Sequence, residues 1–349
     1  MNNNPSKEEI INQAFQFHSQ GNIREATKYY QSFINQGFED YRVFSNYGVI
    51  LKDLGKLKEA EKSYRKAIQL NPNFANAYYN LGNVLRDLGK LKEAEKSYRK
   101  AIQLNPNFAN AYYNLGNVLR DLGKLKEAEK SYRKAIQLNP NFANAHSNLG
   151  NILNNLGKLK EAEVSTRKAI ELNPHLAIAY SNLGSILQDL GNLQEAEVST
   201  RQAIKLVPNY ADAHLNLGSI FRDLGKLEEA EVSILKAIKL NPDYAIAYSN
   251  LGSILRDLGK LEEAEVYTPK AIELDPDLAI AHSNLGGLLI DLGKLQKAEL
   301  SICKAIELDP DLAVAYYSLS KLKVFNKNTI WRDQLFSKKI LNNQLEKDQ

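Results

Sequence analysis

The sequence of 349 residues contains one cysteine, one methionine and one tryptophan. The single cysteine, Cys303, excludes an internal disulfide framework and a metal site built from several cysteines, and it does not favour redox chemistry. Long apolar runs are also missing, because no stretch approaches the ~18 apolar residues that span a bilayer. The N-terminus, MNNNPSKEEIINQAF, lacks the charged start, apolar core and cleavage site of a secretory signal. We therefore expect a soluble, cytoplasmic protein that does not enter a membrane.

Neither sign of charge dominates, since 45 basic and 41 acidic residues give a net charge of +4. The charge is nevertheless distributed unevenly along the chain. Residues 41–74 carry seven basic and three acidic groups, whereas residues 245–278 carry three basic and seven acidic groups. Such a gradient can make molecules attract one another head to tail, so self-association is one expectation. A uniformly basic groove for nucleic acid is not supported, and no nucleic-acid partner is expected.

Glycine and proline recur at a fixed interval of 34 residues. The prolines are Pro72, Pro106, Pro140, Pro174, Pro208, Pro242, Pro276 and Pro310. The glycines are Gly48, Gly82, Gly116, Gly150, Gly184, Gly218, Gly252 and Gly286. Residues 75–108 return without one change as residues 109–142. The chain is therefore an array of repeated units rather than a set of unrelated domains.

One unit, residues 75–108, illustrates the expected local structure. Apolar and small residues recur at helical spacing in each half, and Gly89 lies between the halves as a helix stop. Asn105 precedes a proline and is thereby disfavoured in a helical conformation, which ends the second segment. Asn107 is a candidate N-cap for the next helix. The pattern predicts an all-α protein in which each unit is a helix, a tight turn and a second helix.

The combination of a bulky residue, Leu-Gly, alanine, an aromatic residue, alanine and proline at fixed offsets resembles the tetratricopeptide repeat (TPR). We number each unit so that Ala75 is position 1. The resemblance implies a right-handed α-solenoid superhelix of 34-residue helix-turn-helix repeats. Eight repeats match: 41–74, 75–108, 109–142, 143–176, 177–210, 211–244, 245–278 and 279–312.

The ends of the array depart from the pattern. Residues 7–40 keep part of it and are predicted to form a degenerate repeat, whereas residues 1–6 are predicted to be a disordered N-terminus. Residues 313–341 are predicted to form a partial repeat with a capping helix, followed by a polar tail at 342–349. Within the array, positions 22 and 24 change together near residues 143–176, from lysine and tyrosine to valine and threonine or isoleucine, which indicates two ways of packing the second helix. We expect unfolding to divide into two cooperative blocks there.

Position 6 carries an asparagine in all eight repeats: Asn46, Asn80, Asn114, Asn148, Asn182, Asn216, Asn250 and Asn284. This row resembles the TPR region of O-linked N-acetylglucosamine transferases. The resemblance implies a concave groove in which an asparagine ladder binds the backbone of an extended polypeptide. An asparagine amide has both a donor and an acceptor for a peptide group. Helices about 10 Å apart would place one asparagine at every third residue of an extended chain.

Other groove positions are candidates for the same peptide site. They are Tyr79 and Tyr113 at position 5, Asn83 and Asn117 at position 9, and Arg86 and Arg120 at position 12. Two structural alternatives remain open at this point. The position-6 asparagines could instead bond to the neighbouring repeat, and each arginine, which precedes an aspartate, could form a solvated ion pair.

No motif for catalysis, a cofactor or a metal is present, so we expect no enzyme, no cofactor and no metal site. His146, His214 and His282 occupy position 4, where other repeats have aromatic residues, and are expected to be structural. The leading hypothesis is a non-enzymatic protein-interaction scaffold for extended polypeptide. A first alternative is the substrate-recruiting arm of a transferase, because the last 35 residues resemble the segment that joins such arrays to a sulfotransferase domain in some bacterial proteins. A second alternative is a self-associating structural spacer.

Overall fold

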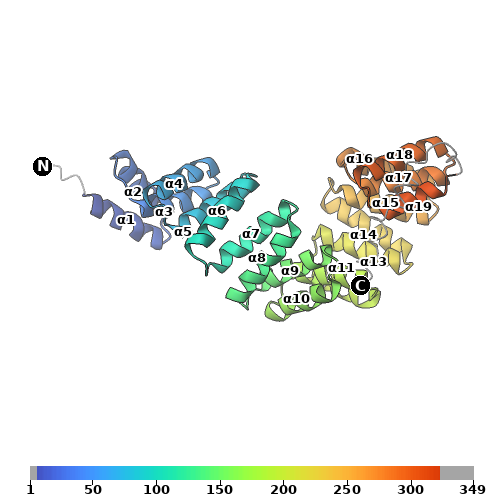
Figure 1. The fold of residues 1–349 in the computed structure, drawn as a ribbon, viewed down its shortest axis with the longest axis horizontal. Coiled ribbons are helices and arrows are strands. Elements are labelled where there is room, and N and C mark those ends of the chain that lie inside the picture. The colour runs from blue at the N-terminus through green and yellow to red at the C-terminus, as the bar shows by residue number, and fades with distance from the viewer. Residues whose placement is uncertain (1–5, 323–349) are drawn as a thin grey trace. The chain divides into compact units, whose positions relative to one another are not determined.

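The computed structural model describes residues 6–322, which form nineteen α-helices without a strand (Figure 1). The predicted all-α fold is confirmed. The chain divides into two units, Met1–Leu156 and Gly157–Gln349. The predicted N-terminal segment other than Ser6, most of the C-terminal cap and the polar tail lie outside the described residues, as does most of the segment that resembles a sulfotransferase linker.

The first unit contains nine of the helices, and the first eight pack as four consecutive pairs joined by short turns. The nine helices are α1 (Lys7–Ser19), α2 (Ile23–Asn35), α3 (Tyr41–Asp53), α4 (Leu57–Leu70), α5 (Ala75–Asp87), α6 (Leu91–Leu104), α7 (Ala109–Asp121), α8 (Leu125–Leu138) and α9 (Ala143–Asn155). Within a pair the two helices contact each other along their length, and the second helix also contacts the first helix of the next pair.

The second unit contains the remaining described helices and repeats the same packing from α11 onward. They are α10 (Leu159–Leu172), α11 (Ala177–Asp189), α12 (Leu193–Leu206), α13 (Ala211–Asp223), α14 (Leu227–Leu240), α15 (Ala245–Asp257), α16 (Leu261–Leu274), α17 (Ala279–Asp291), α18 (Leu295–Leu308) and α19 (Ala313–Ser320). Pro269 lies inside α16, and this helix has the same bounds within its repeat as α14, so the proline does not end it.

The turn inside each pair depends on a glycine in the left-handed region. At Gly89, φ is 73°, a value that residues with a Cβ adopt with strain. The amide of Gly89 donates to the carbonyl of Arg86 at 2.9 Å, and the amide of Lys90 donates to the carbonyl of Leu85 at 2.8 Å. These two bonds close the first helix and reverse the chain in three residues, as in a Schellman motif.

The turn between pairs forms differently from the sequence prediction. The N-cap of α7 is Phe108, whose side chain makes no capping bond, so the prediction that Asn107 caps this helix was wrong. Instead, the side-chain oxygen of Asn105 accepts from the amide of Asn107 at 3.1 Å. Asparagine side chains bond readily to the backbone two residues further on, and this local turn competes with a cap.

Positions 8 and 24 fill the interior of each repeat together. A Cβ added to Gly82 would lie 2.7 Å from the ring of Tyr98, which is fully buried. In the second unit the residue at position 24 is smaller, and the corresponding contact joins Gly184 to Thr200. The glycine therefore makes room for the side chain at position 24, whichever residue that is.

Thr200 has a buried hydroxyl without a hydrogen-bond partner, whereas the equivalent hydroxyl of Thr268 donates to the carbonyl of Ala264 at 2.8 Å. We expect Thr200→Val to raise the free energy of unfolding by about 1 kcal/mol, because an unsatisfied buried polar group is replaced by a methyl group. Urea unfolding followed by circular dichroism measures the change. Thr268→Val is the matched control and should be destabilising, and equal effects of both substitutions would contradict this explanation.

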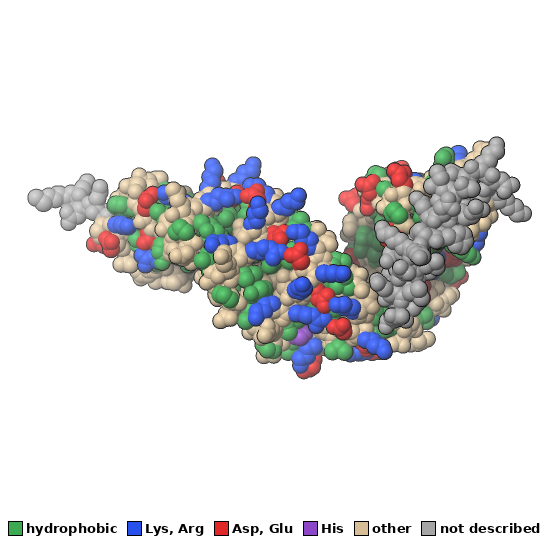
Figure 2. All heavy atoms as spheres, viewed as in Figure 1, with side chains coloured by type: hydrophobic (Ala, Val, Ile, Leu, Met, Phe, Trp, Pro, Cys, Tyr) green, Lys and Arg blue, Asp and Glu red, His purple; other side chains and the backbone are tan. Residues whose placement is uncertain are grey.

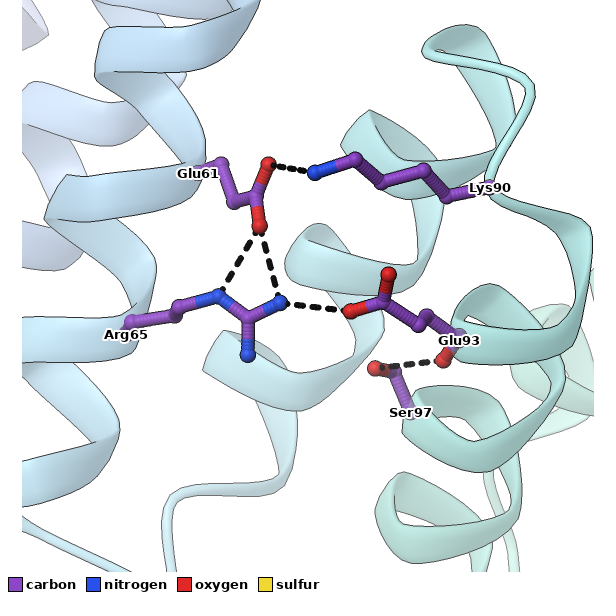
Figure 3. A network of polar contacts seen from close by, with 5 residues as sticks. All are labelled: Glu61, Arg65, Lys90, Glu93 and Ser97. Carbon is purple, nitrogen blue, oxygen red and sulfur yellow. Dashed lines mark hydrogen bonds and ion pairs between the residues drawn. The ribbon is translucent and has the colours of Figure 1, made fainter.

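Ion pairs link the second helices of neighbouring pairs, which we call the outer helices (Figure 3). Arg65 contacts Glu61 at 2.8 Å on its own helix and Glu93 at 2.8 Å on α6, while Lys90 contacts Glu61 at 2.8 Å. The hydrogen bond from Lys90 lowers the pKa of Glu61, and Arg65 adds to this effect against the desolvation of the carboxyl. Because the arginine side chains are half exposed, each pair adds little to stability by itself.

Of the helices described, none combines the length and the apolar character that crossing a bilayer requires.

Candidate functional site

The predicted site residues all lie on the first helices of their pairs, on α3, α5, α7, α9, α11, α13, α15 and α17. Most of the position-6 asparagines are half-buried, and Asn114 is 9% exposed. Tyr79, Tyr113, Asn83 and Asn117 are half-buried as well. Many of these residues bond to a neighbouring repeat and are partly exposed to solvent, so their hydrogen bonds determine which atoms are left for a ligand.

In the first unit, Asn114 is part of a hydrogen-bond network with the preceding repeat. Its amide nitrogen donates to the side-chain oxygen of Asn83 at 2.8 Å and to the hydroxyl of Tyr79 at 3.1 Å. The hydroxyl of Tyr98 donates to the same oxygen of Asn83 at 2.7 Å. Burial raises the pKa of Tyr98, so this hydroxyl remains a donor at any physiological pH.

The identical repeat that follows has the same network. The amide nitrogen of Asn148 donates to Asn117 at 2.9 Å and to the hydroxyl of Tyr113 at 3.3 Å, and Tyr132 donates to Asn117 at 2.8 Å. The position-6 asparagine therefore does bond to the neighbouring repeat. It does so through its side-chain nitrogen, and its partners are side chains at positions 5 and 9.

Each network leaves an acceptor and donors unused, among them one atom on each of its two asparagines. The side-chain oxygen of Asn114 accepts no hydrogen bond, and the amide nitrogen of Asn83 donates none, within residues 6–322. Neither atom is among the fully buried polar atoms without a partner, so both keep contact with solvent. Asn83 and Asn114 thus have together what one free asparagine has, a donor and an acceptor for a peptide group.

In the second unit, Asn216 and Asn284 bond to a serine at position 5 of the preceding repeat. The amide nitrogen of Asn216 donates to the hydroxyl of Ser181 at 3.0 Å, and that of Asn284 donates to the hydroxyl of Ser249 at 2.9 Å. Weaker contacts at 3.4 Å join both nitrogens to the carbonyls of the same serines. The hydrogen-bond partner depends on the residue at position 5, whereas the donor is the side-chain nitrogen of the asparagine in both units.

Two asparagines differ from the others. Asn80 and Asn250 make no side-chain hydrogen bond within the described part of the chain. Position 5 of the repeat that precedes Asn250 is Leu215, which offers no polar atom. Asn46 lies close enough to Tyr30 to lower the pKa of its hydroxyl, although burial dominates and raises that pKa to about 12.

The arginines at position 12 pair with aspartates in two ways. Arg86 contacts Asp87 at 3.0 Å and Arg120 contacts Asp121 at 2.9 Å, each within one repeat. In the second unit, Arg222 contacts Asp257 of the following repeat at 2.8 Å. These pairs are between a quarter and half exposed, in agreement with the solvated ion pairs that the sequence left open.

The tyrosines at position 5 pack against the next turn. The rings of Tyr79 and Phe108 have centroids 4.7 Å apart, and those of Tyr113 and Phe142 are 4.6 Å apart. Because each tyrosine also accepts a hydrogen bond from an asparagine, the two rings are held in place before any ligand arrives.

The position-4 histidines have a structural partner. The ring nitrogens of His214 and His282 bond to the carbonyls of Pro208 and Pro276 at 3.0 Å. No group of three or more histidine, cysteine or carboxylate side chains among residues 6–322 could hold a metal ion.

The sequence prediction missed two features of these surfaces. The contribution of the position-24 tyrosine to the asparagine network could have been suspected, because tyrosine at position 24 and asparagine at position 9 occur together in residues 75–142. The sequence also gave no sign that the aliphatic residue at position 22 is exposed.

Comparison with known proteins assigns the family. The family model of the cilia and flagella-associated protein 70 C-terminal domain, a TPR domain, matches residues 74–283, which is more than half of the chain. Two further models, a TPR repeat and a tetratricopeptide repeat, match residues 48–89 and 279–312. The chain belongs to the family of the first model and is an array of tetratricopeptide repeats. Comparison with curated proteins found no match to this chain.

Solved structures agree with the fold. A chain in the crystal structure of the APC/C hetero-tetramer Cut9–Hcn1 has a TM-score of 0.63 at 17% identity, over 86% of this chain and 59% of that chain. A tetratricopeptide repeat protein from Parabacteroides merdae has a TM-score of 0.56 at 20% identity, over 70% and 97%. YrrB, described as a TPR protein with an unusual peptide-binding site, is 32% identical over 53% and 95%, with a TM-score of 0.43. At these identities the first two show a shared TPR solenoid fold.

Proposed function

We propose that this protein is a non-enzymatic scaffold that binds an extended polypeptide along its first helices, through the position-6 asparagines and their neighbours at position 9. The proposal depends chiefly on the unused donor of Asn83 and the unused acceptor of Asn114, which lie on neighbouring repeats joined by a hydrogen bond. A peptide group has the complementary pair, an N–H and a C=O. The same two atoms are unused in Asn117 and Asn148.

The network favours binding because it fixes the amides in advance. An asparagine whose nitrogen is already bonded has little rotamer freedom left to lose when a peptide approaches its oxygen. Each hydrogen bond to the peptide contributes about 0.5–1.5 kcal/mol net. Several such contacts, offset by the cost of ordering the peptide, give an affinity in the micromolar range.

The chemistry also indicates what kind of partner is bound. Asparagine amides recognise the backbone and are indifferent to side chains, so the site accepts many sequences in an extended conformation. Tyr79 and Tyr113 add an aromatic surface in the first unit, whereas position 5 is serine or leucine in the complete repeats of the second unit. We infer that partners with apolar or proline-rich segments bind preferentially to the first unit, since tyrosine rings favour such contacts.

Asn80→Ala and Asn114→Ala form a matched pair of test variants, because residues 75–108 and 109–142 are identical. Asn80 has no hydrogen bond, whereas Asn114 donates two. We expect both substitutions to weaken binding of an arrayed library of random twelve-residue peptides. Only Asn114→Ala should lower the melting temperature, because it removes the two hydrogen bonds to Asn83 and Tyr79, each worth about 0.5–1.5 kcal/mol. Asn83 still accepts from Tyr98 in this variant.

Fluorescence anisotropy on the peptides that bind the unmodified protein, with thermal unfolding of each variant, separates the two roles. Unchanged peptide affinity in Asn80→Ala would contradict a ligand role for this row of asparagines. The alternative of a transferase arm rests on residues beyond those described and stays a prediction.

A further inference from the structure

The outer helices of the second unit expose a stripe of aliphatic residues at position 22. The members and their exposed fractions are Val164 at 71%, Val198 at 67%, Val232 at 69%, Val266 at 69% and Leu300 at 73%. The same position in the first unit has lysine, at Lys62, Lys96 and Lys130. Five consecutive repeats with a strongly exposed aliphatic residue at one position form a continuous feature of this surface, which singly scattered apolar residues do not.

Position 25 adds to the stripe in the last repeats. The arginine of earlier repeats is replaced by Leu235, Pro269 and Cys303, so positions 22 and 25 are both apolar on α14, α16 and α18. On a helix these positions are neighbours on one face. The outer helices of repeats 211–244 and 245–278 therefore present an apolar pair each, where α4 and α6 present a lysine and an arginine.

Acidic side chains beside the stripe are unpaired, in one case because the arginine of the preceding repeat is lost. Glu93 and Glu127 are bound by Arg65 and Arg99 of the preceding repeat. Glu263 is at the equivalent position but follows Leu235, and it makes no ion pair. Glu228, Glu229 and Glu262 likewise make no side-chain ion pair or hydrogen bond within residues 6–322, and all four glutamates are exposed. We call Val232, Leu235, Val266, Pro269 and these four glutamates the apolar–acidic patch.

A cavity opens beside Val232 and enlarges this surface. It has a volume of about 700 Å³ and lies between α12, α13 and α14, with Ile204, Leu217 and Phe221 among its walls and Glu228 and Glu229 on its border. The equivalent cavities beside Lys96 and Lys130 have volumes of about 350 and 320 Å³. Arg201, Lys205 and Lys236 border the cavity as well as the two glutamates, so it adds apolar surface without a net negative charge. The exposed valines and the glutamates beside them suit a long aliphatic side chain that ends in a cation.

The first unit has side chains of this kind on its own outer helices. Position 18 and position 22 are both lysine in three successive repeats, at Lys58, Lys62, Lys92, Lys96, Lys126 and Lys130. All six are exposed and make no side-chain ion pair or hydrogen bond in the described part of the chain. We call them the lysine patch. In Figure 2, basic side chains gather over α6 and α8, and acidic side chains gather over α16.

We propose that the apolar–acidic patch of one molecule docks on the lysine patch of a second copy of this chain. The aliphatic stems of the lysines cover the exposed valines, while their ammonium groups pair with Glu228, Glu229, Glu262 and Glu263. Both patches have the spacing of the same 34-residue repeat, so a pair of residues that meets in one repeat meets again in the next.

The two patches are different surfaces, so the contact is heterologous and each dimer keeps one free patch of each kind. Further copies can then add at both ends. Lys236 and Lys270 lie one helical turn beyond Val232 and Val266, on the side away from the glutamates, and they limit the contact to the N-terminal halves of α14 and α16. Peptide binding to the first helices uses other residues and does not depend on this contact.

Sedimentation velocity of the full chain tests the proposal. One of the two variants below introduces residues that other repeats already have at the same positions. One variant, Glu228→Lys/Val232→Lys/Glu262→Lys/Val266→Lys, receives the lysines of positions 18 and 22 from the first unit. A second variant, Lys92→Glu/Lys96→Glu/Lys126→Glu/Lys130→Glu, reverses the lysine patch. We expect the unmodified protein to associate with rising concentration and to dissociate when salt rises from about 0.05 to 0.5 M, since the charges are exposed.

Each variant alone should have a dissociation constant at least about tenfold higher than the unmodified protein, because like charges face one another. Mixing the two variants should restore association, because the intact lysine patch of the first variant meets the intact apolar–acidic patch of the second. The introduced lysines can also meet the introduced glutamates. Circular dichroism verifies that both variants are folded. A monomeric unmodified protein at all concentrations, or association that both variants retain, would overturn the proposal without affecting the peptide-binding one.

Discussion

Replacing Tyr98 by alanine is expected to lower the free energy of unfolding by about 3–5 kcal/mol, which is typical for truncation of a buried aromatic residue. The side chain is fully buried, its ring lies against the backbone of Gly82, and its hydroxyl donates to Asn83. Because Gly82 has no side chain, alanine in place of Tyr98 would leave an unfilled cavity beside this glycine. It would also remove the hydrogen bond that positions Asn83 for the network with Asn114.

Urea unfolding measured by circular dichroism gives the size of this loss. Tyr98→Phe is the matched control, since it keeps the ring and removes only the hydroxyl, and it should cost about 1 kcal/mol. Tyr132→Ala in the identical repeat should give the same loss as Tyr98→Ala. If Tyr98→Ala were tolerated as well as Tyr98→Phe, packing of position 24 against position 8 would not be what stabilises the repeat.

Pro269→Ala is expected to raise the free energy of unfolding by about 3 kcal/mol, the usual cost of proline in a helix interior. Proline has no amide hydrogen for the carbonyl of Glu265, four residues earlier in α16, and its ring crowds that carbonyl. The helix nevertheless runs from Leu261 to Leu274, so packing against α15 compensates for the missing bond. Amide exchange between Glu265 and Ile272 should slow down in the variant.

Leu235→Ala is the matched control for this prediction, because it changes the same position of the preceding repeat without a change in backbone hydrogen bonding. Its effect should be small, since Leu235 is 39% exposed. A stability of Pro269→Ala equal to that of the unmodified protein would show that the proline is accommodated without cost at this position.

The period of 34 residues predicts the helices well, because it depends on residues with a strong local effect. A glycine such as Gly89 determines where the first helix ends, and proline determines where the second helix ends. The N-cap prediction at Asn107 failed for a local reason, since Asn105 offers its side chain to the amide of Asn107 first. The start of such a helix depends on which of two asparagine side chains, Asn105 or Asn107, accepts a hydrogen bond from the nearby backbone amides.

The hydrogen-bond partners of the asparagine row could not be predicted from one repeat. Asn80 and Asn114 lie in identical repeats, yet only Asn114 follows a repeat with Tyr79 and Asn83. The partner of each asparagine depends on positions 5 and 9 of the repeat before it. The sequence contains that information, but it becomes visible only when the helix packing shows which positions meet.

The apolar residues at position 22 illustrate a different limit. Valine at three-to-four-residue spacing in a helix is usually read as part of the buried face. Alanine, threonine or isoleucine at positions 20 and 24 fills that face here, so Val232 is left outside. The exposure follows from the width of the buried face, which the periodicity alone does not define.

Backbone recognition by the asparagine row is tested most directly by isothermal titration with two versions of one peptide. The peptide is the tightest binder from the random twelve-residue library, and the second version has N-methyl groups on every third backbone amide. If asparagine oxygens accept from the peptide backbone, methylation should raise the dissociation constant by about tenfold or more, since several hydrogen bonds of about 1 kcal/mol are lost. A version with the same residues in shuffled order should bind almost as well as the original. Equal affinity of the methylated peptide, or complete loss of binding on shuffling, would contradict recognition of the backbone.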